Sequence, residues 1–169
     1  VYVTGWTYGL GWVSGGWDTT FNGGKDGIVL KLNSAGGYAW STYLGGANYD
    51  YGEDIAVDSS GACYVTGRTD SSGWISGGYD TTYDGEIDGF VVKLDSTGGH
   101  VWSTYVGGTN TDYGYGVTAD AAGNCYATGE TRSAGWVNGG WDPTLNNDGV
   151  SPAQDGYVVK LSSVGEHIW

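Results

Sequence analysis

Short runs of apolar and β-branched residues, separated by glycine-rich turns, recur along the whole chain. In the most complete stretch, Asp54–Asp58 is followed by a Ser-Ser-Gly turn and then by three further runs, Ala62–Arg68, Asp88–Leu94 and His100–Val106. Runs of this length between turn residues are typical of β-strands, and no apolar spacing of three and four residues predicts a helix. The pattern therefore predicts four strands joined in meander order.

The same pattern occurs almost three times, with a period of 62 residues. Tyr-Val-Thr-Gly at Tyr2–Gly5 returns at Tyr64–Gly67 and, with one change, at Tyr126–Gly129. A period of this length indicates stacked supersecondary units. The middle strands are apolar on both faces, as in sheets that are covered on both sides. We therefore expect an all-β chain, a β-propeller built from four-stranded antiparallel blades; a β-sandwich is the alternative, but it does not account for the repeat.

We expect residues 1–169 to form part of one propeller or repeat domain. Residues 1–52 form an incomplete blade, residues 53–113 a complete blade, and residues 114–169 a blade with a truncated last strand. The third unit contains five extra residues around Asn146–Gln154, in its long polar loop. Because the outer units are incomplete, the expected partners are further repeats of the same chain or identical subunits.

The charge of the chain narrows the classes of partner. The net charge is −13 and the pI about 4.1, with only six Lys and Arg residues, so the surface repels phosphate backbones and no nucleic-acid partner is expected. No stretch approaches the roughly 20 apolar residues of a membrane span. An acidic surface suits an extracellular or cell-surface location.

Cys63 and Cys125 lie one period apart, too far for a disulfide in stacked units, so we predict two free, buried thiols.

Four segments of the middle repeat are distinctive: Asp-Thr-Thr-Tyr at Asp80–Tyr83, Asp-Gly-Phe-Val-Val-Lys-Leu at Asp88–Leu94, Trp-Ser-Thr-Tyr-Val-Gly-Gly at Trp102–Gly108, and Ile55–Gly67. These segments resemble the SBBP β-propeller repeats of bacteria and archaea. The last segment is also similar to NHL-type blades. The resemblance implies a secreted or surface-attached propeller without catalytic residues. The Gly-Trp-Val-Ser-Gly-Gly-Trp segment departs from the family, where a shorter loop is expected.

This unusual loop contains the candidate ligand-binding residues. Aromatic faces beside carboxylates are a common way to hold sugar rings, because the rings stack and the acids accept hydroxyl protons. The competing interpretation is that the aromatic residues fill gaps between blades and that the aspartates cap turns. The candidates, one set per repeat, are Trp12, Trp17 and Asp18, then Trp74, Tyr79 and Asp80, then Trp136, Trp141 and Asp142.

Other aspartates and two histidines also recur. The aspartates are Asp26, Asp88 and Asp155 at the start of one strand, and Asp50 and Asp112 before another. Oxygen ligands suit Ca²⁺, but no dense calcium-loop motif is present. Strand-end hydrogen bonds without a cofactor are therefore the main interpretation, and Ca²⁺ bound by these aspartates is the alternative. His100 and His167 lie one period apart and do not converge on one point, as catalysis requires.

These observations favour a non-catalytic extracellular repeat module with a structural or adhesive role, part of a larger surface or fibrous assembly. The alternative is a lectin-like propeller that binds glycans through its Trp-rich loops. No residue set favours an enzyme.

Overall fold

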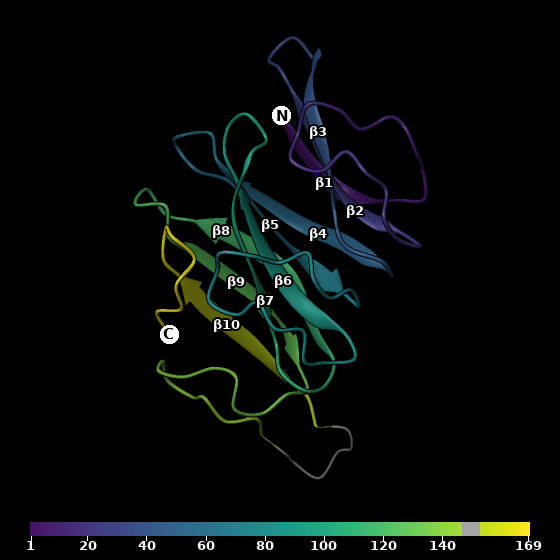
Figure 1. Cartoon of the computed structure of the whole chain (residues 1–169). Coiled ribbons are helices and arrows are strands. Elements are labelled where there is room, and N and C mark those ends of the chain that lie inside the picture. Colours follow the sequence, from purple (N-terminus) through teal and green to yellow (C-terminus); the bar gives the residue numbers. More distant parts are fainter. Residues whose placement is uncertain (147–152) are drawn as a thin grey trace.

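The computed structural model describes residues 1–146 and 153–169, and this part of the chain forms ten β-strands (Figure 1). The predicted all-β class is confirmed. The extra residues expected around Asn146–Gln154 lie mostly outside the described residues. The described residues contain no helix, and hence none long and apolar enough to cross a membrane. The strands are β1 (Tyr2–Thr7), β2 (Asp26–Leu32), β3 (Tyr38–Leu44), β4 (Asp50–Val57), β5 (Cys63–Thr69), β6 (Asp88–Leu94), β7 (His100–Val106), β8 (Asp112–Ala119), β9 (Cys125–Thr131) and β10 (Asp155–Leu161).

The strands form three antiparallel sheets in meander order, as the repeat predicted. The first sheet has the order β1-β2-β3, the second β4-β5-β6-β7, and the third β8-β9-β10. Strands β4 and β8 begin at Asp50 and Asp112, before the run that the sequence indicated, because polar residues at their starts also pair with the next strand. Each of these two strands contains a bulge, after Gly52 and after Gly114.

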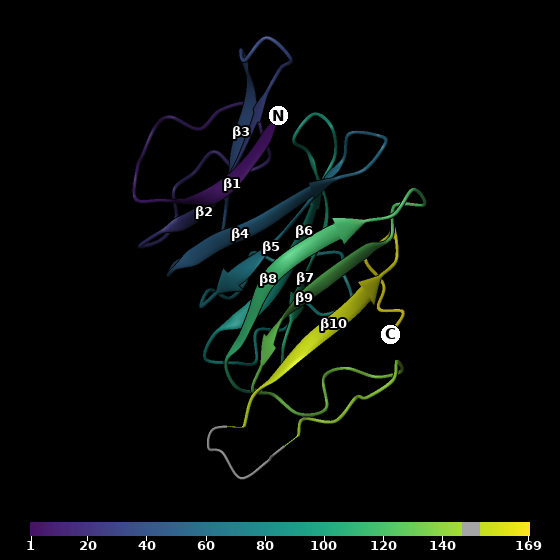
Figure 2. The same cartoon turned by 180° about the vertical axis from the view of Figure 1, so that it is seen from behind.

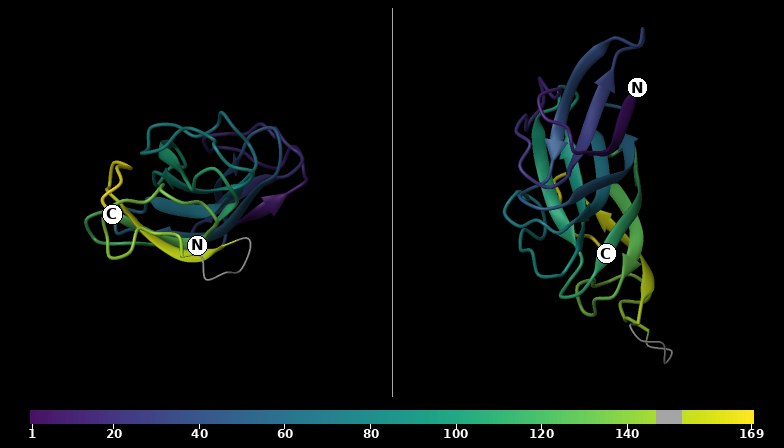
Figure 3. Two further views of the ribbon diagram at one scale, coloured as in Figure 1. Left: turned by 90° about the horizontal axis from the view of Figure 1, so that it is seen from below. Right: turned by 90° about the vertical axis from the view of Figure 1, so that its right-hand side faces the viewer.

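The three sheets lie one after another, with the first sheet at one end of the molecule and the third at the other (Figures 2 and 3). Strand β4 of the second sheet packs against β1 and β2 of the first, and β8 packs against β4, β5 and β6. Each of these junctions therefore uses the first strand of the following sheet.

Each junction has its own hydrophobic core. Val29 and Trp40 of the first sheet pack with Cys63 and Val65 of the second, whereas Val91 of the second packs in another cluster with residues of the third. Strand β6 thus contributes to both cores, because successive side chains of a strand point to opposite faces. This arrangement explains why the middle strands are apolar on both faces.

Both cysteines are free and completely buried, as predicted. Cys63 lies in the first core and Cys125 in the second, one repeat further on. Burial raises the pKa of both thiols to about 12, which keeps them protonated and unreactive at neutral pH.

Side-chain hydrogen bonds join each sheet to the turn that precedes the outer strand of the next repeat. Lys31 Nζ and Trp40 Nε1 both donate to the Ser96 carbonyl oxygen, at 2.6 and 3.2 Å. One repeat later, Lys93 Nζ and Trp102 Nε1 both donate to Ser163, at 3.0 and 3.1 Å. The repeated Lys and Trp positions therefore fasten each sheet to the next.

Candidate functional site

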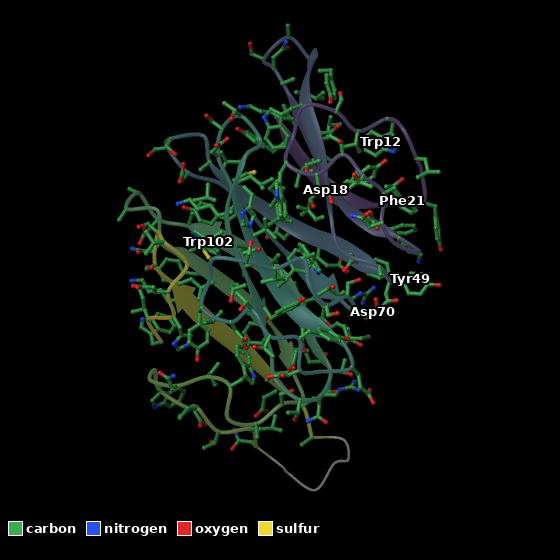
Figure 4. The ribbon with its side chains drawn as sticks, viewed as in Figure 1. Trp12, Asp18, Phe21, Tyr49, Asp70 and Trp102 are labelled. Atoms are coloured by element: carbon green, nitrogen blue, oxygen red, sulfur yellow. The ribbon has the colours of Figure 1, made fainter. Side chains whose placement is uncertain are left out.

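The long loops lie beside the outer strand of their own sheet. In the first repeat the amides of Ser41 and Tyr43 donate to the carbonyls of Ser14 and Asp18, both at 2.8 Å. In the second repeat Ser103 and Tyr105 donate in the same way to Ser76 and Asp80. The loop thus adds a short parallel partner to the sheet edge (Figure 4, where Trp12, Asp18 and Phe21 are labelled).

The loop aspartates form turns within the loop. Asp18 Oδ1 accepts the amide of Thr20 at 2.8 Å, Asp80 Oδ1 accepts that of Thr82 at 2.9 Å, and Asp142 Oδ1 accepts that of Thr144 at 3.0 Å. Hydrogen bonds from Thr144 lower the pKa of Asp142. The turn-capping interpretation therefore accounts for the carboxylates of all three repeats.

The first aromatic residue of each loop packs on its own repeat. Trp74 meets Phe90 edge-on and donates from Nε1 to Thr69 Oγ1 at 3.2 Å. Trp136 meets Tyr157 edge-on and donates to Thr131 Oγ1 at 2.9 Å. Trp12 lies edge-on to Tyr43 and is 41% exposed. In the second and third repeats this tryptophan is therefore half-buried and hydrogen-bonded, which fits a structural role.

The second aromatic residue of each loop contacts the next sheet. The ring of Trp17 stacks on His100, with centroids 4.2 Å apart and planes at 28°, and Tyr79 lies over His167 at 4.9 Å and 33°. Burial lowers the pKa of both histidines, so they are neutral at pH 7. Trp141, the third member of this set, is 100% exposed.

The three candidate residues converge on one cavity only in the third repeat, among the residues described. There Trp136, Trp141 and Asp142 line a cavity of about 600 Å³, together with Tyr157 and Trp169. In the first two repeats the outer strand fills the equivalent space. In the part of the chain that the structure describes, the sequence-predicted residues of the third repeat thus share a surface open to a ligand.

The aspartates at the start of β4 and β8 belong to buried hydrogen-bond networks. Asp50 accepts hydrogen bonds from the hydroxyls of Thr69 and Ser71 and from the amide of Gly46. Asp112 accepts the equivalent three bonds from Thr131, Ser133 and Gly108. Thr69 also receives the Trp74 bond, so the network ties the loop to the strand ends. Within the described residues no group of three or more His, Cys, Asp or Glu side chains is placed to hold a metal.

The carboxyl group of Asp88 is buried, but hydrogen bonds satisfy only one of its two oxygens. Its side chain is 1% exposed, one oxygen accepts a bond of 3.3 Å from the Asp84 amide, and the other has no hydrogen-bond partner in the described part of the chain. Burial raises the pKa of Asp88 to about 7, and nearby Asp112 adds to this effect. Burial likewise raises the pKa of Asp50 to about 6.

We therefore expect stability to rise as the pH falls from 8 to about 5. Asp88 and Asp50 bind protons more tightly in the folded chain than in the unfolded chain, where their pKa values return to about 3.9. Folding takes up protons in this window, so the free energy of unfolding increases on acidification, by about 4 kcal/mol. Urea denaturation at each pH measures this free energy of unfolding. Asp88→Asn should flatten the dependence above pH 6, and an unchanged slope would contradict this explanation.

The sequence interpretation missed a row of cations and aromatic rings at one end of the sheets. Lys25 Nζ lies 4.4 Å from the ring centroid of Trp6 and 4.8 Å from that of Tyr51. Arg68 lies between Tyr51 and Tyr113, at 4.5 and 5.5 Å. A hydrogen bond to Tyr51 raises the pKa of Lys25. These contacts join all three sheets, because a cation is attracted electrostatically to the face of an aromatic ring. A comparison of the repeats finds the cations and Trp6, because Trp6, Arg68 and Glu130 occupy one repeated position and Lys25 corresponds to Ile87.

The geometry defines a repeat protein made of consecutive antiparallel sheets with similar junctions. Residues 39–73 and 101–135 match the model of the SBBP family, described as a β-propeller repeat. The chain therefore contains repeats of the SBBP type, as its motifs indicated. No curated protein matches the chain in sequence.

Proposed function

We propose that the chain is a non-catalytic structural and adhesive module of an extracellular β-propeller assembly, in which both end sheets pack against further repeats of the same kind. One observation carries this proposal. Side chains that are exposed on the outward faces of the first and third sheets have counterparts in the other repeats that are buried between two sheets.

The outward face of the third sheet supports this proposal. Val158 is 57% exposed, although its counterparts Val29 and Val91 are completely buried against the following sheet. Trp169 is 37% exposed, whereas Trp102 is 2% exposed and bonded to the following sheet. Trp141 is fully exposed, whereas Trp17 stacks on a histidine. These side chains match a junction that the molecule already forms twice.

The outward face of the first sheet also exposes residues whose counterparts are buried between sheets. Val3 is 42% exposed, although its counterparts Val65 and Ala127 are completely buried. A Cβ atom at Gly5 would meet no atom within 4 Å, whereas at Gly67 it would lie 1.8 Å from the carbonyl oxygen of Tyr51 in β4. The first sheet therefore has room for a strand placed as β4 is on the second. Large exposed apolar faces of this kind are typical of interaction surfaces.

The extracellular location is supported by composition and by resemblance. A net charge of −13 favours solubility and excludes polyanions as partners. A scaffold role is supported by the candidate residues of the first two repeats, which mostly pack, cap turns or join sheets. These recurring contacts stabilise the repeats and the junctions between them, which is what a structural role requires.

The particle mass tests the assembly. We expect the wild-type chain to form particles several times heavier than its 17.7 kDa, measured by light scattering. Val158→Asp places a charge on the outward face of the third sheet and should reduce this mass to that of small species. Val101→Asp is the matched control, because Val101 is 47% exposed on the outer strand β7. A monomeric wild type, or equal effects of both variants, would reject the proposal.

Glycan binding is a second candidate function, favoured by the cavity of the third repeat. Trp136, Trp141 and Asp142 offer aromatic faces and an acceptor around about 600 Å³, a volume in the range of small-ligand sites. A glycan array tests this function, with Trp141→Ala as the variant that removes the exposed ring and Trp17→Ala as its counterpart in the first repeat. Binding that depends on Trp141 alone would support a lectin.

A further inference from the structure

A second cavity, of about 220 Å³, lies at the end of the second sheet where the side chain of Arg68 stacks on tyrosines. The starts of β4, β6 and β8 and the end of β5 surround it, and Figure 4 labels two of its residues, Tyr49 and Asp70. Sheets lie on both sides of this cavity, because β4 contacts the first sheet and β8 belongs to the third. Its lining residues are Tyr49, Tyr51, Arg68, Asp70, Ile87 and Tyr113.

The first junction has a counterpart of this cavity that a lysine fills. Lys25 Nζ lies 4.4 and 5.0 Å from the ring centroids of Trp6 and Tyr8, and it donates to Tyr51 Oη at 2.9 Å. One period later, the positions of Lys25, Trp6, Tyr8 and Tyr51 hold Ile87, Arg68, Asp70 and Tyr113, all of which line the cavity. Because Ile87 has a shorter side chain than Lys25 and no ammonium group, the second junction keeps open the space that the first one fills.

The guanidinium group of Arg68 is held in place by aromatic rings. Its Cζ lies 4.5 Å from the ring centroid of Tyr51 and 5.5 Å from that of Tyr113. In the described part of the chain its ionic partner is Glu53, with 3.7 Å between Nη2 and Oε1, which is too long for a hydrogen bond. A fixed guanidinium with unused N–H groups is well suited to bind a carboxylate through two parallel hydrogen bonds.

Asp70 supplies the opposite charge on the same cavity. Its Oδ1 accepts the amide of Tyr49, and its own amide donates to the Tyr49 carbonyl oxygen at 3.2 Å, so the carboxylate has a defined position. Among the described residues, Oδ2 of Asp70 accepts no hydrogen bond, and no salt bridge joins Asp70 to Arg68. An ammonium group in the cavity would therefore find an acceptor with a full negative charge.

The charges and rings of this cavity are complementary to a small zwitterion. A ligand that carries a carboxylate and an ammonium group uses both Arg68 and Asp70, and it is neutral overall, so the net charge of −13 does not repel it. The tyrosine rings and Ile87 supply apolar surface for a side chain. The volume lies below the range of about 300–1,000 Å³ for drug-sized ligands, which limits the ligand to a single small molecule.

We propose that this cavity binds a free α-amino acid with an apolar or aromatic side chain. The carboxylate of the ligand binds Arg68, its ammonium group binds Asp70, and its side chain packs against the tyrosine rings. This inference is independent of the proposed assembly, because residues 49–113 form the whole cavity within the chain.

Three related ligands test this assignment. We expect L-phenylalanine to bind the folded chain in calorimetry at up to millimolar concentration. Hydrocinnamate lacks the ammonium group and L-phenylalaninamide lacks the carboxylate, and each should bind at least about tenfold more weakly, because one charged group of the cavity then has no partner. The amide is a cation, so unspecific attraction to the acidic chain would instead make it the tightest of the three.

Two variants of the chain test the site. Ile87→Lys should abolish binding, because a lysine at this position fills the space as Lys25 does at the first junction. Arg68→Gln should weaken binding at least about tenfold. Arg132→Gln is the matched control, because it removes the same charge from a residue that does not line the cavity, and it should bind as the wild type does. Tryptophan fluorescence shows whether each variant is folded, and the ligand series on the wild-type chain tests the proposal even where a variant does not fold.

Several outcomes would overturn the inference. They are no binding of L-phenylalanine to the folded wild-type chain, equal binding of hydrocinnamate or L-phenylalaninamide, unchanged binding to a folded Ile87→Lys chain, and equal losses in Arg68→Gln and Arg132→Gln. Methyl glucoside that binds through Arg68 where L-phenylalanine does not would also overturn it and assign the cavity to neutral sugars. A monomeric wild type that binds L-phenylalanine would reject the proposed assembly and support this inference.

Discussion

Gly67→Ala is expected to destabilise the chain by about 3 kcal/mol or more, at the upper end of what overpacking costs. Gly67 ends the Tyr-Val-Thr-Gly motif on β5 and pairs with Gly52 of β4, just before the bulge. A Cβ atom would lie 1.8 Å from the Tyr51 carbonyl oxygen, a backbone atom that a rotamer change does not move. Because a domain of this size loses about 2–4 °C per kcal/mol, thermal unfolding should shift by about 6–12 °C.

Gly5→Ala is the matched control for this prediction. Gly5 has the same place in the motif, but a Cβ atom there meets nothing within 4 Å. We expect this variant to unfold at nearly the wild-type temperature and, on the proposed function, to form smaller particles. Equal destabilisation by Gly5→Ala and Gly67→Ala would show that the motif needs its glycine for another reason, such as chain entropy, rather than for the approach of β4.

The strands were predictable because their signals are local. Asp88–Leu94 and His100–Val106 form β6 and β7 with the bounds that the sequence indicated, since apolar side chains and flanking turns specify both ends. The start of β4 at Asp50 was not predictable in this way. Asp50 joins the strand through hydrogen bonds to Thr69 and Ser71, which lie far from it in the sequence.

The candidate site was predictable only in part. The sequence grouped Trp17 with Trp12 and Asp18, but Trp17 stacks on His100 of another sheet, a contact that depends on how the sheets pack. Its interpretation as a filler between units fits this contact. The equivalent motif of the third repeat leaves Trp141 fully exposed, because the described residues place no further sheet beside it. The fate of one repeated residue thus depends on its neighbours in space rather than on its motif.

Trp102→Ala should cost about 3–5 kcal/mol, the usual range for a buried tryptophan. The side chain is 2% exposed and lies at the junction of the second and third sheets, as labelled in Figure 4. It donates from Nε1 to the Ser163 carbonyl oxygen at 3.1 Å and lies edge-on to Tyr64, with ring centroids 6.3 Å apart. Its loss leaves a cavity at the same junction, where Lys93 alone then donates to the Ser163 carbonyl oxygen.

We expect this loss to affect the third sheet more than the first. In amide exchange, protection in β9 and β10 should fall further than in β1 and β2, because the altered junction is the one that holds the third sheet. Trp141→Ala, at a fully exposed tryptophan, is the matched control and should change the free energy of unfolding by less than about 0.5 kcal/mol. If the two variants unfold at the same urea concentration, or if β1 and β2 lose as much protection as β9 and β10, then Trp102 does not fasten the second sheet to the third.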